Sequence, residues 1–172
     1  MDFAKILGER EWRPAVDRVI AAVEARRDRL PDLLALLDHE HTGTVMRAAM
    51  ALADLGRAHP DWLRPHHAEL LAALTPDPID ATNRCLLRYF AELPLADIDP
   101  DIEGELLDLA FARGSDIRKT VTIRMWGLQI VANYCERYPE LKDELRQTIE
   151  DQLETSSAGF RSRGRKMLAG LR

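Results

Sequence analysis

The sequence has few of the features that catalysis or metal binding needs. Its nine glycines are scattered, so no glycine-rich phosphate loop occurs, and no serine lies in a Gly-x-Ser-x-Gly pattern. The two cysteines, Cys85 and Cys135, have no zinc or redox spacing, and we expect both to be reduced thiols in the core. We therefore predict no catalytic residue and no cofactor, although enzymatic activity of an unfamiliar kind stays open.

The histidines also lack the spacing of a metal site. They fall as neighbours or near neighbours, for example at His39 and His41 and at His66 and His67. Side chains one or two positions apart on a helix point in different directions and do not converge on one ion. We predict no metal site.

Long hydrophobic runs are missing as well. The longest apolar stretches are a few residues, against roughly 20 for a membrane-spanning helix. The first residues, Met-Asp-Phe-Ala-Lys, lack the basic start and apolar core of a signal peptide. We expect a cytoplasmic protein with no membrane association.

Signals for β-structure are weak, whereas signals for helices are frequent. The hairpin dipeptides Asn-Gly and Asp-Gly are absent, and strict alternation of polar and apolar residues is rare. Leucines recur at helical spacing in three runs, near residues 33–37, 70–74 and 106–109. The sequence therefore predicts an all-α protein.

A proline–acid–apolar tripeptide divides the chain into repeats. Its four copies are Pro31-Asp32-Leu33, Pro60-Asp61-Trp62, Pro100-Asp101-Ile102 and Pro139-Glu140-Leu141. An arginine within a second apolar run follows each copy, in order Arg47, Arg84, Arg124 and Arg165. A period of about 40 residues is typical of stacked helix pairs. Proline followed by an acid favours a helix start, because the first turn needs no proline N–H and attracts negative charge.

The repeats predict a first helix and a partner helix in each pair, called here A and B. The expected A helices cover about 31–39, 61–74, 100–113 and 139–154. The expected B helices cover about 43–58, 80–93, 117–137 and 157–170. We predict a single domain over residues 1–172, with an N-terminal capping segment at 1–28 (its helix at about 10–27) and repeats at about 29–58, 60–93, 99–137 and 139–172.

These pairs resemble the HEAT repeats. The resemblance is best where Leu33-Leu34-Ala35-Leu36-Leu37-Asp38 leads to Val45-Met46-Arg47-Ala48-Ala49-Met50-Ala51-Leu52, and it continues in the run from Leu70 to Asp77 that leads to Arg84-Cys85-Leu86-Leu87. It implies a right-handed α-α superhelix, an armadillo-like solenoid, of about four helix pairs plus an N-terminal helix. Val45 is one residue nearer Leu52 than usual, and the third B helix is expected to be unusually long. These departures favour an irregular stack.

Charge is distributed unevenly between the two kinds of helix. The A segments carry 5 basic and 18 acidic residues, and the B segments carry 13 basic and 5 acidic. The HEAT resemblance implies that B helices line the concave face, which would then be basic and suited to an acidic peptide or to nucleic acid. The alternative is structural, because arginines recurring near each turn often form a ladder to aspartates of neighbouring repeats.

Seven residues are candidates for partner binding. They are Arg47, Arg84, Arg88, Arg124, Trp62, Arg165 and Lys166. The last two belong to the densest basic stretch of the chain, which also holds Arg161, Arg163 and Arg172. Trp62, directly after a helix start, is the candidate aromatic anchor.

The leading hypothesis is a non-enzymatic scaffold or adaptor that docks an acidic protein or peptide on its B-helix face. A second hypothesis is nucleic-acid binding, as in HEAT-like DNA-alkylation-repair glycosylases, although no catalytic acid stands out among Asp54, Asp80 and Asp116. A third is a HEAT-like bilin lyase subunit, which only the shared repeat favours. A homodimer formed through the last helix also stays open.

Overall fold

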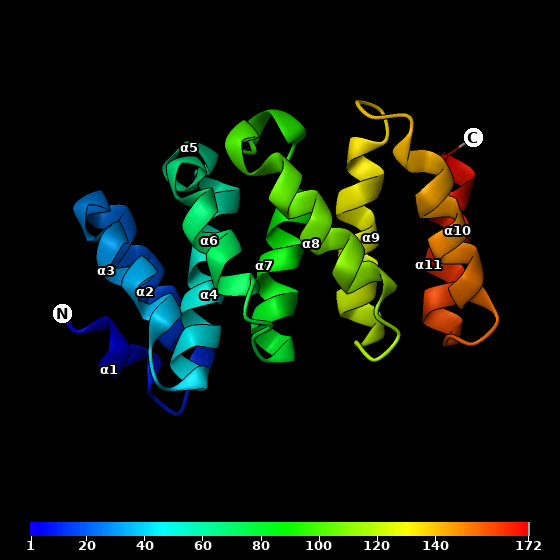
Figure 1. The fold of residues 1–172 in the computed structure, drawn as a ribbon. Coiled ribbons are helices and arrows are strands. Elements are labelled where there is room, and N and C mark those ends of the chain that lie inside the picture. Colours follow the sequence, from blue (N-terminus) through cyan, green and yellow to red (C-terminus); the bar gives the residue numbers. More distant parts are fainter. Residues whose placement is uncertain (172) are drawn as a thin grey trace. The chain divides into compact units, whose positions relative to one another are not determined.

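The computed structural model describes residues 1–171, and every regular element in that range is helical (Figure 1). The prediction of an all-α protein is therefore confirmed. The chain forms two compact units, Met1–Tyr89 and a second that begins at Phe90, with the division inside helix α7. The single domain and the handedness of the superhelix stay predictions, and each unit is described here by itself.

The first unit consists of seven α-helices joined by short 3₁₀ turns. These are α1 (Phe3–Leu7), α2 (Trp12–Ala25), α3 (Leu30–Leu34), α4 (Thr42–Ala58), α5 (Pro60–Leu63), α6 (His67–Leu74) and α7 (Asp80–Glu92), with 3₁₀ helices at Arg27–Arg29, Ala35–Asp38 and Arg64–His66. Helix α4 is its centre and packs against α1, α2, α3 and α5. The expected B helices at 43–58 and 80–93 therefore match α4 and α7 closely.

The second unit holds four helices of 13 or 14 residues each. They are α8 (Glu103–Ser115), α9 (Val121–Tyr134), α10 (Leu141–Leu153) and α11 (Ala158–Gly170), preceded by 3₁₀ helices at Leu95–Asp97 and Pro100–Ile102. Helix α9 contacts α8, α10 and α11, and α10 and α11 lie side by side (Figure 1). Helix α9 is thus the central element of this unit.

Three of the expected A helices contain 3₁₀ turns that their proline starts did not predict. The expected helix at 31–39 divides into α3 and the 3₁₀ helix Ala35–Asp38. Pro65 interrupts the expected helix at 61–74, which divides into α5, a 3₁₀ turn at Arg64–His66 and α6, because proline lacks an N–H donor and clashes with the preceding turn. The copy at Pro100 likewise forms a 3₁₀ turn, and α8 begins only at Glu103.

The third B helix is 14 residues long, so the expectation of an unusually long helix at 117–137 is wrong. Asp116 accepts hydrogen bonds from the Arg118 backbone N–H, at 3.0 Å, and from the Arg118 guanidinium. These bonds favour a turn at 116–119 and delay the helix until Val121.

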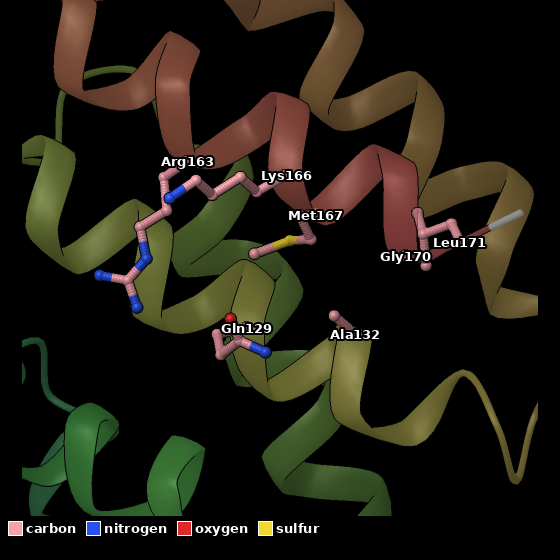
Figure 2. A pocket seen from close by; sticks show the side chains of 7 residues that line it. All are labelled: Gln129, Ala132, Arg163, Lys166, Met167, Gly170 and Leu171. Atoms are coloured by element: carbon pink, nitrogen blue, oxygen red, sulfur yellow. The ribbon is translucent and has the colours of Figure 1, made fainter.

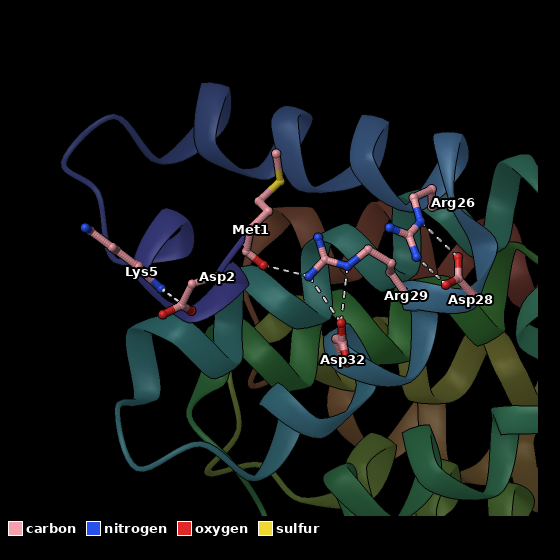
Figure 3. Close-up of polar contacts among 7 residues, drawn as sticks. All are labelled: Met1, Asp2, Lys5, Arg26, Asp28, Arg29 and Asp32. Atoms are coloured by element: carbon pink, nitrogen blue, oxygen red, sulfur yellow. Dashed lines mark hydrogen bonds and ion pairs between the residues drawn. The ribbon is translucent and has the colours of Figure 1, made fainter.

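Arginines hold the N-terminal end of the first unit together. Arg29 donates to the Met1 carbonyl oxygen at 2.7 Å and to Asp32 at 3.2 Å (Figure 3). Its guanidinium also lies 4.0 Å from the Phe3 ring centroid. Arg47 donates to the carbonyl oxygens of Leu7 and Glu9, the second at 2.6 Å. Helix α1, which the sequence did not predict, is therefore fixed at both ends by arginine side chains.

Close helix packing in the second unit depends on glycine. A Cβ atom on Gly127 of α9 would lie 2.5 Å from the Ala110 carbonyl oxygen of α8, and one on Gly114 would lie 2.7 Å from the Leu128 side chain. Helices α8 and α9 therefore approach each other more closely than side chains would allow. This contact fixes α9, and α9 in turn positions the candidate site.

Candidate functional site: a basic cleft between α9 and α11

Two of the recurring arginines have structural partners inside the fold. Arg47 is half-buried and bound to the carbonyl oxygens at the end of α1, as described above. Arg124 donates to Gln152 Oε1 at 2.6 Å and to Ser156 Oγ at 3.1 Å. Both residues therefore tie helices together, through carbonyl, amide and hydroxyl oxygens rather than through the aspartates of the expected ladder.

The inclusion of Arg124 among the partner-binding candidates has to be corrected. Its side chain is 6% exposed, and its guanidinium carbon lies 4.8 Å from the centroid of the Phe160 ring. Burial lowers the pKa of Arg124 because desolvation disfavours the charged form. A guanidinium enclosed in this way cannot reach a partner on the surface.

The remaining candidates of the first unit lie at its surface. Arg84 and Arg88 are exposed on α7, one turn apart. Trp62 is half-buried, stacks on His59 with ring centroids 4.2 Å apart, and has the Arg27 guanidinium 5.1 Å from its ring centroid. These contacts already cover part of the tryptophan ring.

Arg165 and Lys166 do not share a site, although they are adjacent in the sequence. Lys166 lines a cleft between α9 and α11, whereas Arg165 lines a separate hollow with Arg146 and Glu150 of α10. Two neighbours on a helix are about 100° apart, so they point to different sides. Arg172, the last member of the basic stretch, lies outside the described residues.

The cleft between α9 and α11 is the most complete candidate site. It encloses about 400 Å³ and is lined by Gln129, Ala132, Arg163, Lys166, Met167, Gly170 and Leu171. Figure 2 shows Gln129 and Ala132 on the α9 side and Met167 reaching from α11 towards them. Helix periodicity explains the α11 face, because residues 163, 166, 167 and 170 are three or four positions apart.

The electrostatics of the cleft differ from those of the rest of the chain. Neither α9 nor α11 contains an acidic residue. Within residues 1–171, the only recorded polar or ring contact of Arg163 is with Trp126, where its guanidinium lies 4.3 Å from the ring centroid, and Lys166 has none. A cation–π contact orients a guanidinium without neutralising it. The cleft therefore offers two cations to an anionic ligand.

Sequence reasoning predicted this site only in part. Lys166 was a candidate, and Arg163 belonged to the basic stretch without being singled out. Gln129 and Met167 were missed, because nothing in a single helix pattern says which two helices face each other. A signal that could have found the site is the spacing of Arg163, Lys166 and Gly170, which places all three on one face of an expected helix.

Several other chemistries lack support in the part of the chain that the structure describes. No three His, Cys, Asp or Glu side chains there gather as a metal site would require. Both cysteines are free thiols, Cys135 buried and Cys85 half-buried. Among the helices of residues 1–171, none has the length and apolar character needed to cross a membrane.

The family model described as a HEAT repeat domain matches residues 3–171, nearly the whole chain. No curated protein and no solved structure matches this chain.

Proposed function

This chain belongs to the HEAT repeat domain family, and we propose that it is a protein-interaction module that docks an acidic segment of a partner in the cleft between α9 and α11. HEAT repeats commonly mediate protein interactions, so the general role follows from the family. The location of the site and the chemistry of the partner are the specific parts of the proposal.

One observation carries the proposal. Arg163 and Lys166 of α11 border the same cleft, which lies between two helices without acidic residues, and neither has a carboxylate partner within residues 1–171. Carboxylates of a bound segment would supply the missing counter-charge, and a charged hydrogen bond to each cation is stronger than a neutral one. Met167 and Leu171 add apolar surface that would contact the neighbouring residues of that segment.

The charge of the chain favours a protein over nucleic acid as the partner. The net charge is −5, and α10, which packs against α11, carries four acidic residues within 141–153. Sequence-independent DNA binding gains its affinity from Lys and Arg contacts to several phosphates along the duplex. Two basic side chains beside an acidic helix are better matched to a pair of carboxylates.

Fluorescence anisotropy with a labelled acidic peptide, a DNA duplex and a DNA single strand tests the proposal at two salt concentrations. We expect the wild-type protein to bind the peptide. The double variant Arg163→Glu/Lys166→Glu should weaken peptide binding about 100-fold, because it replaces two attractive charges with two repulsive ones. Arg165→Glu is the matched control, since it makes the same kind of change on the other side of α11, and it should bind like the wild type.

Two results would contradict the proposal. One is equal peptide affinity in the double variant and the wild type, with both folded by circular dichroism. The other is DNA binding that exceeds peptide binding, falls steeply with salt and disappears in the double variant, which would assign the cleft to nucleic acid instead.

A further inference from the structure

A second hollow of opposite charge lies beside the basic cleft. It encloses about 750 Å³ between the residues at the end of α7 and after it (91–96) and Ala132, Asn133 and Glu136. Ala132 of α9 lines both hollows, so the two meet along this helix. The two adjoining hollows, called the groove below, have basic side chains at one end and acidic side chains at the other.

Side-chain amides form the floor where the two hollows meet. Gln129 donates to Asn133 Oδ1 at 2.9 Å, and Asn133 donates to the Ala91 carbonyl oxygen at 2.8 Å. These two bonds hold the last turn of α7, which belongs to the second unit, against α9 and fix the shape of the groove. Because the bonds use one N–H group of each amide, polar atoms remain that could bond to a peptide backbone.

The two ends present opposite charges to a ligand. Arg163 and Lys166 are exposed at the basic end. At the acidic end Glu136 is exposed and has no hydrogen bond or ion pair with another residue of the described range, 1–171. Apolar side chains also line the two hollows, Pro94 and Leu95 in the acidic one and Met167 in the basic one.

We infer that this groove binds an extended segment of a protein partner in which an acidic and a basic side chain are three residues apart. The inference rests on the proposed function and deepens it, since it adds a second charge and a spacing to the acidic segment. The acidic side chain would pair with Arg163 and Lys166, and the basic side chain with Glu136. Apolar or proline residues between them would contact the apolar lining.

The spacing follows from α9 and the turn after it. Gln129 of α9 lines the basic end, and Glu136 lies in the turn that follows Tyr134, seven residues further along the chain. The N–H groups of Arg137 and Tyr138 donate to the Tyr134 carbonyl oxygen, so this turn continues the helical path. At a rise of about 1.5 Å per residue, the backbone at 129 and 136 is about 10 Å apart. An extended chain covers that distance in about three residues. In the polyproline II conformation, residues i and i+3 also lie on the same side of the chain, about 9 Å apart.

The test uses labelled proline-containing peptides of one length and the intact protein. The first peptide carries Glu and Lys three residues apart, in both orders; the second has Gln in place of Lys; the third has Glu and Lys adjacent. We expect the first, in its better order, to bind about fivefold more tightly than the other two, the size of one added exposed ion pair.

Reversing the charge at Glu136 tests whether this residue binds the basic side chain of the peptide. Glu136→Lys should remove the advantage of the Glu/Lys peptide and leave the affinity for the Glu/Gln peptide unchanged or higher. A peptide with Glu at both positions should bind Glu136→Lys more tightly than it binds the wild type. Glu154→Lys, the same change at an exposed position away from the groove, should preserve the wild-type order of affinities.

The outcomes separate this inference from the proposed function. Equal affinity for the Glu/Lys and Glu/Gln peptides, with Glu136→Lys giving no change, would overturn the inference and leave the basic cleft in place. Failure of every peptide to bind the wild-type protein would overturn both.

Discussion

Arginines at the two ends of the chain have opposite uses. Near the N-terminus, Arg29 and Arg47 donate to backbone carbonyl oxygens that α1 and its neighbours leave unpaired. On α11, Arg163 has an aromatic ring as its recorded partner within the described residues, and Lys166 has no recorded partner. The difference teaches that the nearby acceptors decide what an arginine does. A guanidinium beside exposed carbonyl oxygens becomes structural, and one on a helix without acids stays available for a ligand.

The most disruptive test of this comparison is Arg124→Ala. We expect it to lower the free energy of unfolding by about 2 to 4 kcal/mol, because it empties a buried space against Phe160 and leaves Gln152 Oε1 without its donor. Urea denaturation measures the change. Arg163→Ala, at an exposed position in the same unit, should change it by less than about 0.5 kcal/mol. Equal losses in the two variants would mean that Arg163 is structural too.

Arg47→Ala tests the structural role of the arginines near the N-terminus. It removes the donor to the Leu7 and Glu9 carbonyl oxygens, and we expect a loss of about 1 to 2 kcal/mol. Hydrogen exchange should show the amides of α1 exchanging faster while those of α8 stay protected. Arg10→Ala, an exposed arginine in the same unit, is the control. Unchanged protection of α1 in Arg47→Ala would show that Arg29 alone holds this helix.

A smaller effect is expected at the exposed pair of Asp116 and Arg118. The Arg118 guanidinium and its backbone N–H hold the pKa of Asp116 at about 2, below the ordinary 3.8. Because the pKa is lower in the folded state, the carboxylate stabilises the fold at pH values above its pKa in the unfolded chain. This contribution is lost as the pH falls through about 2. Arg118→Ala should raise the pKa of Asp116 part of the way back, because the backbone bond remains. A carboxyl NMR titration measures it, and an unchanged pKa would assign the whole shift to the backbone N–H.

The sequence predicted the helical class, the family and most B helices, because leucine periodicity and proline–acid starts are local signals. It also showed that one arginine recurs in each repeat, but it did not predict which groups these arginines bind. Arg47 and Arg124 look alike in the sequence, and only the packing reveals that one caps α1 and the other is buried against Phe160.

The candidate site was less predictable for a physical reason. Lys166 and Arg163 form a cleft with Gln129 only because α9 and α11 lie beside each other, and this contact depends on long-range packing. The close approach of α8 and α9 at Gly127 also could not be predicted from the sequence, because a single glycine gives no signal of which helix packs against it. Helix α1 was missed because five residues are too few to show a period.

The three tryptophans offer the most direct measurement. Each indole N–H gives its own NMR signal: Trp126 reports on the α9–α11 cleft through its contact with Arg163, and Trp12 and Trp62 report on the first unit. On titration with the acidic peptide, the account predicts that the Trp126 signal shifts in proportion to binding while the other two stay in place. A shift of Trp62 with Trp126 unmoved would contradict it and return the docking site to the aromatic anchor that the sequence first indicated.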